Sequence, residues 1–268
     1  MELALSSKAE SLREIASAAL YVAHSPLHWL IGEAMEFVLV PGAWAGGWIW
    51  DEVAKSLRDR GHNVHQLTLS GLNEQSETCE IGLSTHIEDV ESYIIRHGLE
   101  SIVLVGHSYS GIIVGQVATR GRVSIRHTIF IEAFLPVSGQ SLLDVSGLCI
   151  DEEERAILEN EGMWPAPSRA ELATQPRLND ADINLLCAKQ RPHPGKTVTD
   201  AVKLESPLVD IPATFIAHEG WLSFSRAHDL LATLKSSGSW RFKNIEGGHW
   251  PMLTIPQKLA ELIHSCVA

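Results

Sequence analysis

A serine in a predicted strand-to-helix turn is the best candidate for nucleophilic chemistry in this chain. Ser108 lies in the segment GHSYSG, between the apolar run SIVLV and a helical stretch that begins IIV. Such a turn strains the backbone at the nucleophile, so small residues are needed two positions before and after it. Gly106 and Ser110 meet this need, although the usual G-x-S-x-G pattern has glycine at the second position. The segment predicts Ser108 as the nucleophile of an acyl transfer.

The general base is predicted at His249, in the segment GGHWPM. This segment follows the last expected strand and precedes the last expected helix, so it is expected in a loop at the carboxyl edge of a sheet. From there an imidazole can reach a serine on a neighbouring loop and remove its proton. Of the 13 histidines, only His249 is so placed. We expect His107, beside the nucleophile, to pack or orient rather than to act.

Two carboxylates are candidates for the acid that orients the base. Glu132 ends the expected strand HTIFIE, and a charged group in such apolar surroundings is energetically costly. That cost suggests a functional role for Glu132. Glu219 follows a later expected strand, which also places a carboxylate at the carboxyl edge of the sheet. We favour Glu132 and leave Glu219 as the alternative.

A glycine-rich turn after the first expected strand, PGAWAGGW, can present backbone amides to a substrate. Acyl transfer places negative charge on the carbonyl oxygen, and rigid N–H donors stabilise it. We expect the oxyanion hole at the amides of Ala43 and Tyr109.

Several tryptophans fall on loops that should border the nucleophile, which predicts an aromatic, apolar pocket. The expected substrate contacts are Trp44, Trp164, Trp221 and Trp250.

Short β-branched runs alternate with amphipathic stretches from residue 36 onward, a pattern typical of an α/β fold with a mostly parallel sheet flanked by helices. Six strands are expected at residues 37–40, 63–67, 101–105, 127–132, 213–217 and 240–245. Helices are expected at residues 48–60, 85–97, 110–119, 225–234 and 257–267.

The alternation of strands and helices stops between residues 135 and about 210, where an acidic stretch with helical character is followed by proline-rich stretches. A connection this long inside a domain is usually functional, and we expect a small helical cap. The α/β domain is therefore expected at residues 35–268, and residues 1–34 are expected to form an N-terminal extension, helical or poorly ordered.

Composition narrows the partners. The net charge of −12 disfavours nucleic acid, because phosphate binding needs clustered Lys and Arg. No apolar run approaches the roughly 20 residues that cross a bilayer, so no membrane role is expected. The four cysteines are spread without metal-ligand spacing and predict reduced, mostly buried thiols in the cytoplasm, with no metal site. A small-molecule substrate is the expected partner, and a homodimer is left open.

The three segments PGAWAGGW, GHSYSG and GHWPM resemble small α/β-hydrolases, including carboxylesterase-like bacterial members, plant methylesterases and hydroxynitrile lyases. The resemblance implies a serine hydrolase with a helical cap and no cofactor, and its oxyanion donors correspond to Ala43 and Tyr109. The chain departs from the family at Pro41, which replaces a histidine, at Ser110, and near Trp221, where the usual late acid would align.

The expected activity is hydrolysis of a carboxylic ester or lactone of a small apolar or aromatic substrate through a covalent acyl-enzyme. Two alternatives remain open: a lyase of the hydroxynitrile-lyase type, and a ligand receptor that keeps the hydrolase pocket. The lyase is disfavoured because those relatives use an active-site lysine, and none lies beside His249 or in the Trp221 loop.

Overall fold

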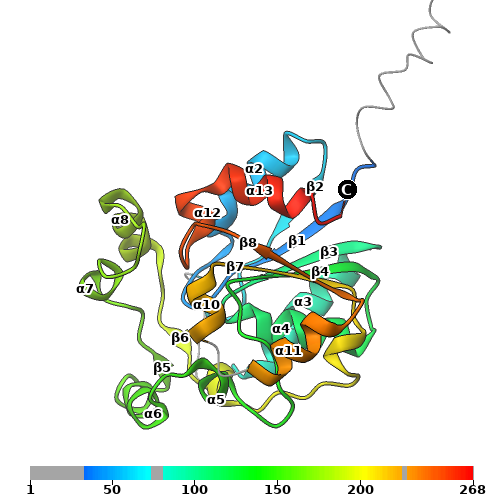
Figure 1. Ribbon diagram of the computed structural model, residues 1–268. Coiled ribbons are helices and arrows are strands. Elements are labelled where there is room, and N and C mark those ends of the chain that lie inside the picture. Colours follow the sequence, from blue (N-terminus) through cyan, green and yellow to red (C-terminus); the bar gives the residue numbers. More distant parts are fainter. Residues whose placement is uncertain (1–32, 74–80, 225–227, 268) are drawn as a thin grey trace, which may run out of the picture. The chain divides into compact units, whose positions relative to one another are not determined.

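Six strands form one sheet in the order β2-β1-β3-β4-β7-β8, and every neighbouring pair is parallel (Figure 1). The computed structural model describes residues 33–73, 81–224 and 228–267. The strands are Glu36–Val40 (β1), Asn63–Gln66 (β2), Ile102–His107 (β3), Ile125–Ile131 (β4), Ala213–Ala217 (β7) and Trp240–Asn244 (β8). The α/β fold expected from the sequence is confirmed.

Two predictions fall on residues that the structure does not describe. The N-terminal extension covers residues 1–34, of which only the last two are described, and the helix expected from Ser225 would begin in the second gap. The described helix there, α11, spans His228–Ser236.

The sheet is buried on both faces, as the alternation along β1 shows. Phe37 and Leu39 belong to the apolar cluster that contains helices α2 (Asp51–Arg58) and α13 (Pro256–His264). Val38 and Val40 belong to a second cluster with α3 (Leu83–Arg96) and α4 (Ser110–Arg120). Successive side chains of a strand point to opposite faces, so one apolar run serves both helical layers. Figure 1 shows these two layers on either side of the sheet.

The helical boundaries have local causes. The first expected helix divides into a 3-10 turn, η2 (Gly47–Trp50), and α2. Helix α4 ends where Gly121 adopts φ +63°, the left-handed conformation that glycine accepts readily. A short helix, α12 (Pro251–Thr254), comes before α13, and each begins with proline at its first position.

The chain between β4 and β7 contains short helices and a small antiparallel sheet. The strands are β5 (Met163–Trp164) and β6 (His193–Pro194). The helices are α5 (Leu142–Ser146), α6 (Ile150–Glu159), α7 (Arg169–Leu172), α8 (Asp180–Lys189), α9 (Lys196–Thr199) and the 3-10 turn η3 (Leu208–Asp210). This segment was expected to be helical only, so the β5–β6 pair is an addition to the prediction. Figure 1 shows α6, α7 and α8 to one side of the main sheet.

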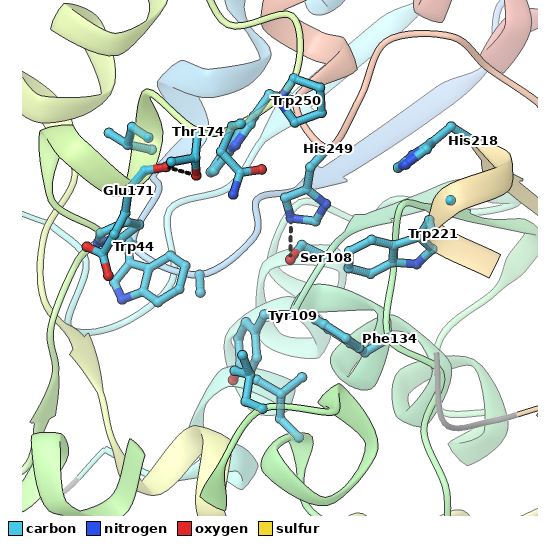
Figure 2. Close-up of a pocket in the computed structure, with 18 of the residues that line it drawn as sticks. Trp44, Ser108, Tyr109, Phe134, Glu171, Thr174, His218, Trp221, His249 and Trp250 are labelled. Atoms are coloured by element: carbon cyan, nitrogen blue, oxygen red, sulfur yellow. Dashed lines mark hydrogen bonds between the residues drawn. The ribbon is translucent and has the colours of Figure 1, made fainter. Parts of the chain in front are cut away.

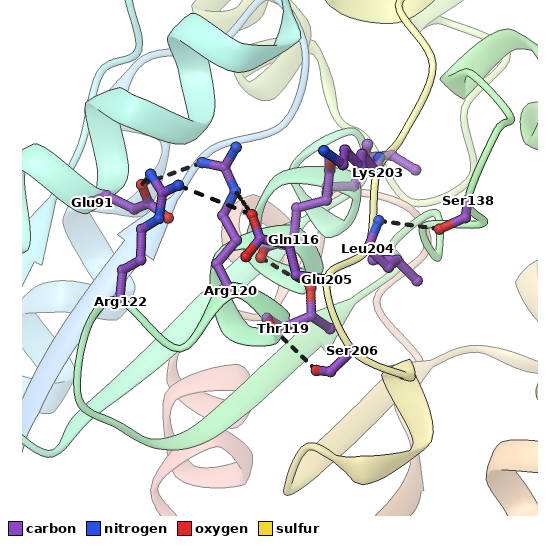
Figure 3. A network of polar contacts seen from close by, with 11 residues as sticks. Glu91, Gln116, Thr119, Arg120, Arg122, Ser138, Lys203, Leu204, Glu205 and Ser206 are labelled. Atoms are coloured by element: carbon purple, nitrogen blue, oxygen red, sulfur yellow. Dashed lines mark hydrogen bonds and ion pairs between the residues drawn. The ribbon is translucent and has the colours of Figure 1, made fainter.

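A polar network fixes the chain where it returns from this segment toward β7 (Figure 3). Nη1 of Arg120 and Nη1 of Arg122 lie 3.3 and 3.5 Å from Oε2 of Glu91, which is largely buried. Nε of Arg120 lies 3.6 Å from Oε1 of Glu205. The hydroxyl of Ser206 donates to the carbonyl at the end of α4, at 3.1 Å. The network therefore ties α3, α4 and the returning chain together.

Two observations bear on the expectations from composition. No helix within the described ranges has the length and apolar character needed to cross a membrane. Cys149 and Cys187 are exposed and only Cys266 is buried, so the prediction of mostly buried thiols is wrong for the described cysteines. Both exposed thiols lie in the segment between β4 and β7, whose short helices leave much of their surface in solvent.

Candidate active site

Ser108 stands in the tight turn between β3 and α4, with a backbone φ of +52°. The turn leaves no room for side chains beside it. A Cβ on Gly106 would lie 2.8 Å from the carbonyl oxygen of Ser110, and one on Gly111 would lie 2.3 Å from that of Phe134. A side chain at either glycine would open the turn, so the local sequence holds Ser108 at its apex.

Ser110, where the usual pattern has a second glycine, has a bonding role of its own. Its buried hydroxyl donates a hydrogen bond to the carbonyl oxygen of Pro41, the residue directly after β1. This hydrogen bond joins the turn at Ser108 to the glycine-rich turn.

His249 is positioned to take the proton of Ser108, because its Nε2 lies 3.1 Å from the serine Oγ (Figure 2). The ring of Trp221 stacks on the imidazole at 4.6 Å between centroids and 21° between planes. His107 holds the backbone, donating from Nε2 to the carbonyl oxygen of His249 at 2.8 Å. Burial lowers the pKa of His107 well below its usual value, so its ring is neutral and acts as a support.

Glu132 is the candidate acid that the structure places beside His249. Its carboxylate is fully buried, and Oε2 lies 3.9 Å from Nδ1 of His249, an ion-pair distance. His218 also binds it: the backbone N–H donates to Oε1 at 2.6 Å, and Nδ1 lies 2.9 Å from each carboxylate oxygen. Glu219, the alternative, is exposed at the start of α10 (Glu219–Phe224). The geometry favours Glu132 and reveals His218 as its second partner.

The amides of Ala43 and Tyr109 donate to no other group in the part of the chain that the structure describes. Tyr109 stands at the N-terminus of α4, where free amides and the helix dipole favour a negative charge. The side chain of Tyr109 is buried, and its hydroxyl is engaged with Nδ1 of His86 at 2.9 Å. Burial also raises the pKa of this phenol, which therefore stays protonated. The backbone, not the phenol, is suited to the chemistry.

A cavity of about 600 Å³ opens over Ser108. All four tryptophans expected to contact a substrate line it, together with Phe134, and Figure 2 shows three of them around the serine. The chain between β4 and β7 supplies further lining residues that were not predicted, including Leu142, Leu148, Pro167, Glu171, Leu172, Thr174, Gln175 and Pro176. His218 was not predicted either. The sequence places His218 directly after the expected strand at residues 213–217, but its contact with Glu132 depends on the pairing of β7 with β4, which only the structure shows.

Within the described ranges, no three His, Cys, Asp or Glu side chains are grouped so that they could hold a metal ion.

A serine at a strand-to-helix turn of a parallel sheet, faced by a histidine from the last strand's loop, defines the α/β-hydrolase fold. Comparison with known proteins agrees. Residues 37–262 match the alpha/beta hydrolase family, and the chain belongs to that family.

The relatives point to ester hydrolysis. A carbendazim hydrolyzing esterase from Nocardioides sp. (strain SG-4G) is 29% identical over 84% of this chain and 96% of its own. Methylesterase 10 from Arabidopsis thaliana is 33% identical over 37% of this chain and 38% of its own. Among solved structures, an extracellular alpha/beta-hydrolase from a Paenibacillus species has a TM-score of 0.75 at 23% identity, covering 87% of this chain and 98% of that one. The solved structure supports the fold, and the two sequence relatives support an ester hydrolase.

Proposed function

We propose that the protein is a serine hydrolase that cleaves a carboxylic ester or lactone of a small, neutral, apolar or aromatic substrate through a covalent acyl-enzyme. The observation that carries this proposal is the 3.1 Å contact between His249 Nε2 and Ser108 Oγ, at the floor of an aromatic cavity. The esterase relatives support the kind of bond.

In the proposed mechanism, Ser108 Oγ attacks the acyl carbon while His249 Nε2 takes its proton. Glu132 stabilises the imidazolium that forms. The negative charge on the carbonyl oxygen receives hydrogen bonds from the amides of Ala43 and Tyr109. The alcohol then leaves with the proton from His249. A water molecule, deprotonated by His249, attacks the acyl-enzyme and releases the carboxylic acid and free Ser108.

The cavity lining supports a neutral substrate. Its described residues include no lysine or arginine that could pair with a free carboxylate. Glu171 lines the wall formed by the chain between β4 and β7, and hydrogen bonds from the side chain and backbone of Ser168 lower the pKa of Glu171. A carboxylate that stays ionised repels an acidic substrate. We expect aryl and alkyl esters to be hydrolysed faster than matched esters that carry a free carboxylate.

The absence of lysine from the described lining also disfavours the lyase alternative. The receptor alternative is separated by turnover: a receptor would react with a fluorophosphonate at Ser108 but release no product from any ester.

The test is the Ser108→Ala variant, assayed on p-nitrophenyl esters and a lactone panel. We expect kcat to fall by at least about 10⁴-fold, the scale seen when a catalytic nucleophile is removed. Fluorophosphonate should add its mass to the wild type at Ser108 and not to the variant. Ser237→Ala, which removes a hydroxyl bonded to the carbonyl of Leu234 near the end of α11, is the matched control and should retain full activity. Undiminished turnover by Ser108→Ala would exclude the proposed mechanism.

A further inference from the structure

Trp44, next to the expected oxyanion donor Ala43, has an unusual backbone conformation. Its φ is +63°, in the left-handed region that bulky side chains rarely adopt. Such a conformation persists only where surrounding contacts hold it, so the contacts of Trp44 identify what shapes the turn.

Three hydrogen bonds hold Trp44, and all of them come from the chain between β4 and β7. The backbone N–H of Trp44 donates to Nδ1 of His193 at 3.2 Å, and its carbonyl accepts from the backbone N–H of Arg191 at 3.0 Å. Its indole Nε1 donates to the carbonyl of Trp164 at 3.2 Å. His193 and Trp164 face each other across the β5–β6 pair. The β5–β6 pair, which was not predicted from the sequence, therefore supplies two of the hydrogen bonds that hold the turn at Trp44.

His193 has the properties of a fixed acceptor. Its side chain is fully buried, and burial lowers its pKa well below the usual value, so the ring stays neutral. Because Nδ1 accepts from Trp44, the proton of the neutral ring is on Nε2. The ring also packs edge-on against Tyr109, the second expected oxyanion residue, at 4.6 Å between centroids. One imidazole thus contacts both sides of the expected oxyanion hole.

We propose that His193 is a positioning residue for the oxyanion hole: through its bond to the Trp44 amide, the β5–β6 pair sets the place of the neighbouring Ala43 amide. This inference rests on the proposed serine hydrolase function. It gives the chain between β4 and β7 a part in stabilising the transition state, beyond its part in forming the cavity wall.

The test compares His193→Leu, which removes the acceptor, with His193→Asn, whose side-chain oxygen can occupy the place of Nδ1. We expect the Leu variant to lower kcat on a p-nitrophenyl ester by about 30-fold with KM changed less than about threefold, because a misplaced donor weakens transition-state binding. Inhibition by an aryl trifluoromethyl ketone, which forms a tetrahedral adduct, should weaken to a similar extent. The Asn variant should retain kcat within about threefold.

His127→Leu is the matched control, since it replaces another buried histidine, one that bonds Thr214 on β7. It should lower the melting temperature and leave kcat unchanged. Should His193→Leu fail to fold, His193→Gln serves in its place, because its longer amide reaches past the Nδ1 position. An unaltered kcat in the folded acceptor-deficient variant, or an equal loss in His193→Asn, would overturn the inference.

A readout independent of turnover separates this inference from the proposed function. Hydrogen exchange at the Trp44 amide should be faster in His193→Leu than in wild type and near the wild-type rate in His193→Asn. A wild type without esterase activity would refute the proposed function, whereas unchanged exchange in His193→Leu would refute the role of His193. Wild-type turnover with unchanged exchange would refute the positioning role alone.

Discussion

The two sides of Ser108 are built differently. On the acid side, His249 and His218 are partly open to solvent, with 20% and 31% of their side chains exposed, and share the buried carboxylate of Glu132. On the oxyanion side, His86 and His193 are fully buried beside Tyr109, and burial lowers the pKa of both. The imidazoles of His249 and His218 therefore lie beside a carboxylate, whereas those of His86 and His193 are neutral.

The difference matches what each side would have to do in catalysis. A general base must gain and lose a proton, so its imidazole needs a carboxylate partner and access to substrate and water. An oxyanion donor must keep its place, so its supports should neither ionise nor move. The hydrogen bonds reflect this difference. Three hydrogen bonds hold Trp44. Nδ1 of His249 has no hydrogen-bond partner within the described residues, and it would need to move about 1 Å closer to Glu132 to form a hydrogen bond.

The acid side is expected to show the largest effect. Glu132→Gln removes the charge that would stabilise the imidazolium, and we expect kcat to fall about 10³- to 10⁴-fold, as when the acid of a serine triad becomes an amide. Glu219→Gln is the matched control and should stay within twofold of wild type. The measurement is kcat on a p-nitrophenyl ester. A large loss in the control instead would move the acid to Glu219.

The oxyanion side can be displaced sterically at Gly42. A Cβ there would lie 2.7 Å from Nδ1 of His107 and 3.1 Å from Cβ of Ser108. Gly42→Ala should push the turn from the nucleophile and lower kcat about 10- to 100-fold, since a shift near 1 Å has effects of this size. Gly238→Ala, with nothing within 4 Å of its new Cβ, is the control. Equal activity in both variants would show that the turn does not need its close approach to Ser108.

The shared carboxylate predicts a smaller effect at His218. His218→Leu removes the imidazole donor and leaves Glu132 with fewer fixed bonds, so we expect kcat to fall about tenfold. His218→Asn, which can still donate, should restore most of the loss. If Asn and Leu were equally impaired, His218 would act through its contact with the cavity and not through Glu132.

The buried imidazoles of the oxyanion side predict how stability varies with pH. The pKa values of His86 and His193 are lowered on folding, so below pH 6.5 the unfolded chain binds protons that the folded protein does not, and stability falls as the pH drops. Each such group contributes up to about 1.4 kcal/mol per pH unit. Urea unfolding from pH 7.5 to 5 should show a shallower decline for His193→Asn than for wild type, because Asn binds no proton. Identical declines would mean that His193 does not titrate as its burial requires.

The motifs made the centre of the site predictable, and the sheet explains why. Ser108 and His249 lie in loops that follow strands, and the carboxyl ends of parallel strands share one edge, so their meeting followed from the order of elements. Glu132 could be favoured over Glu219 because a charge at the end of an apolar strand is costly. The contact of Glu132 with His218 was not predictable, because it depends on the pairing of β4 with β7, which lie more than 80 residues apart.

The sequence by itself determined the strands, the tight turn at Ser108 and the loop that carries His249, because apolar periodicity and tight glycine turns are local properties of the chain. Tertiary structure alone decided how β5 and β6 pair and that they bind Trp44. His193 and Trp44 are separated by 149 positions, and no local rule joins them. Their bond forms because the fold brings the Trp44 amide to the fully buried ring of His193, which is a property of the folded interior and not of either segment.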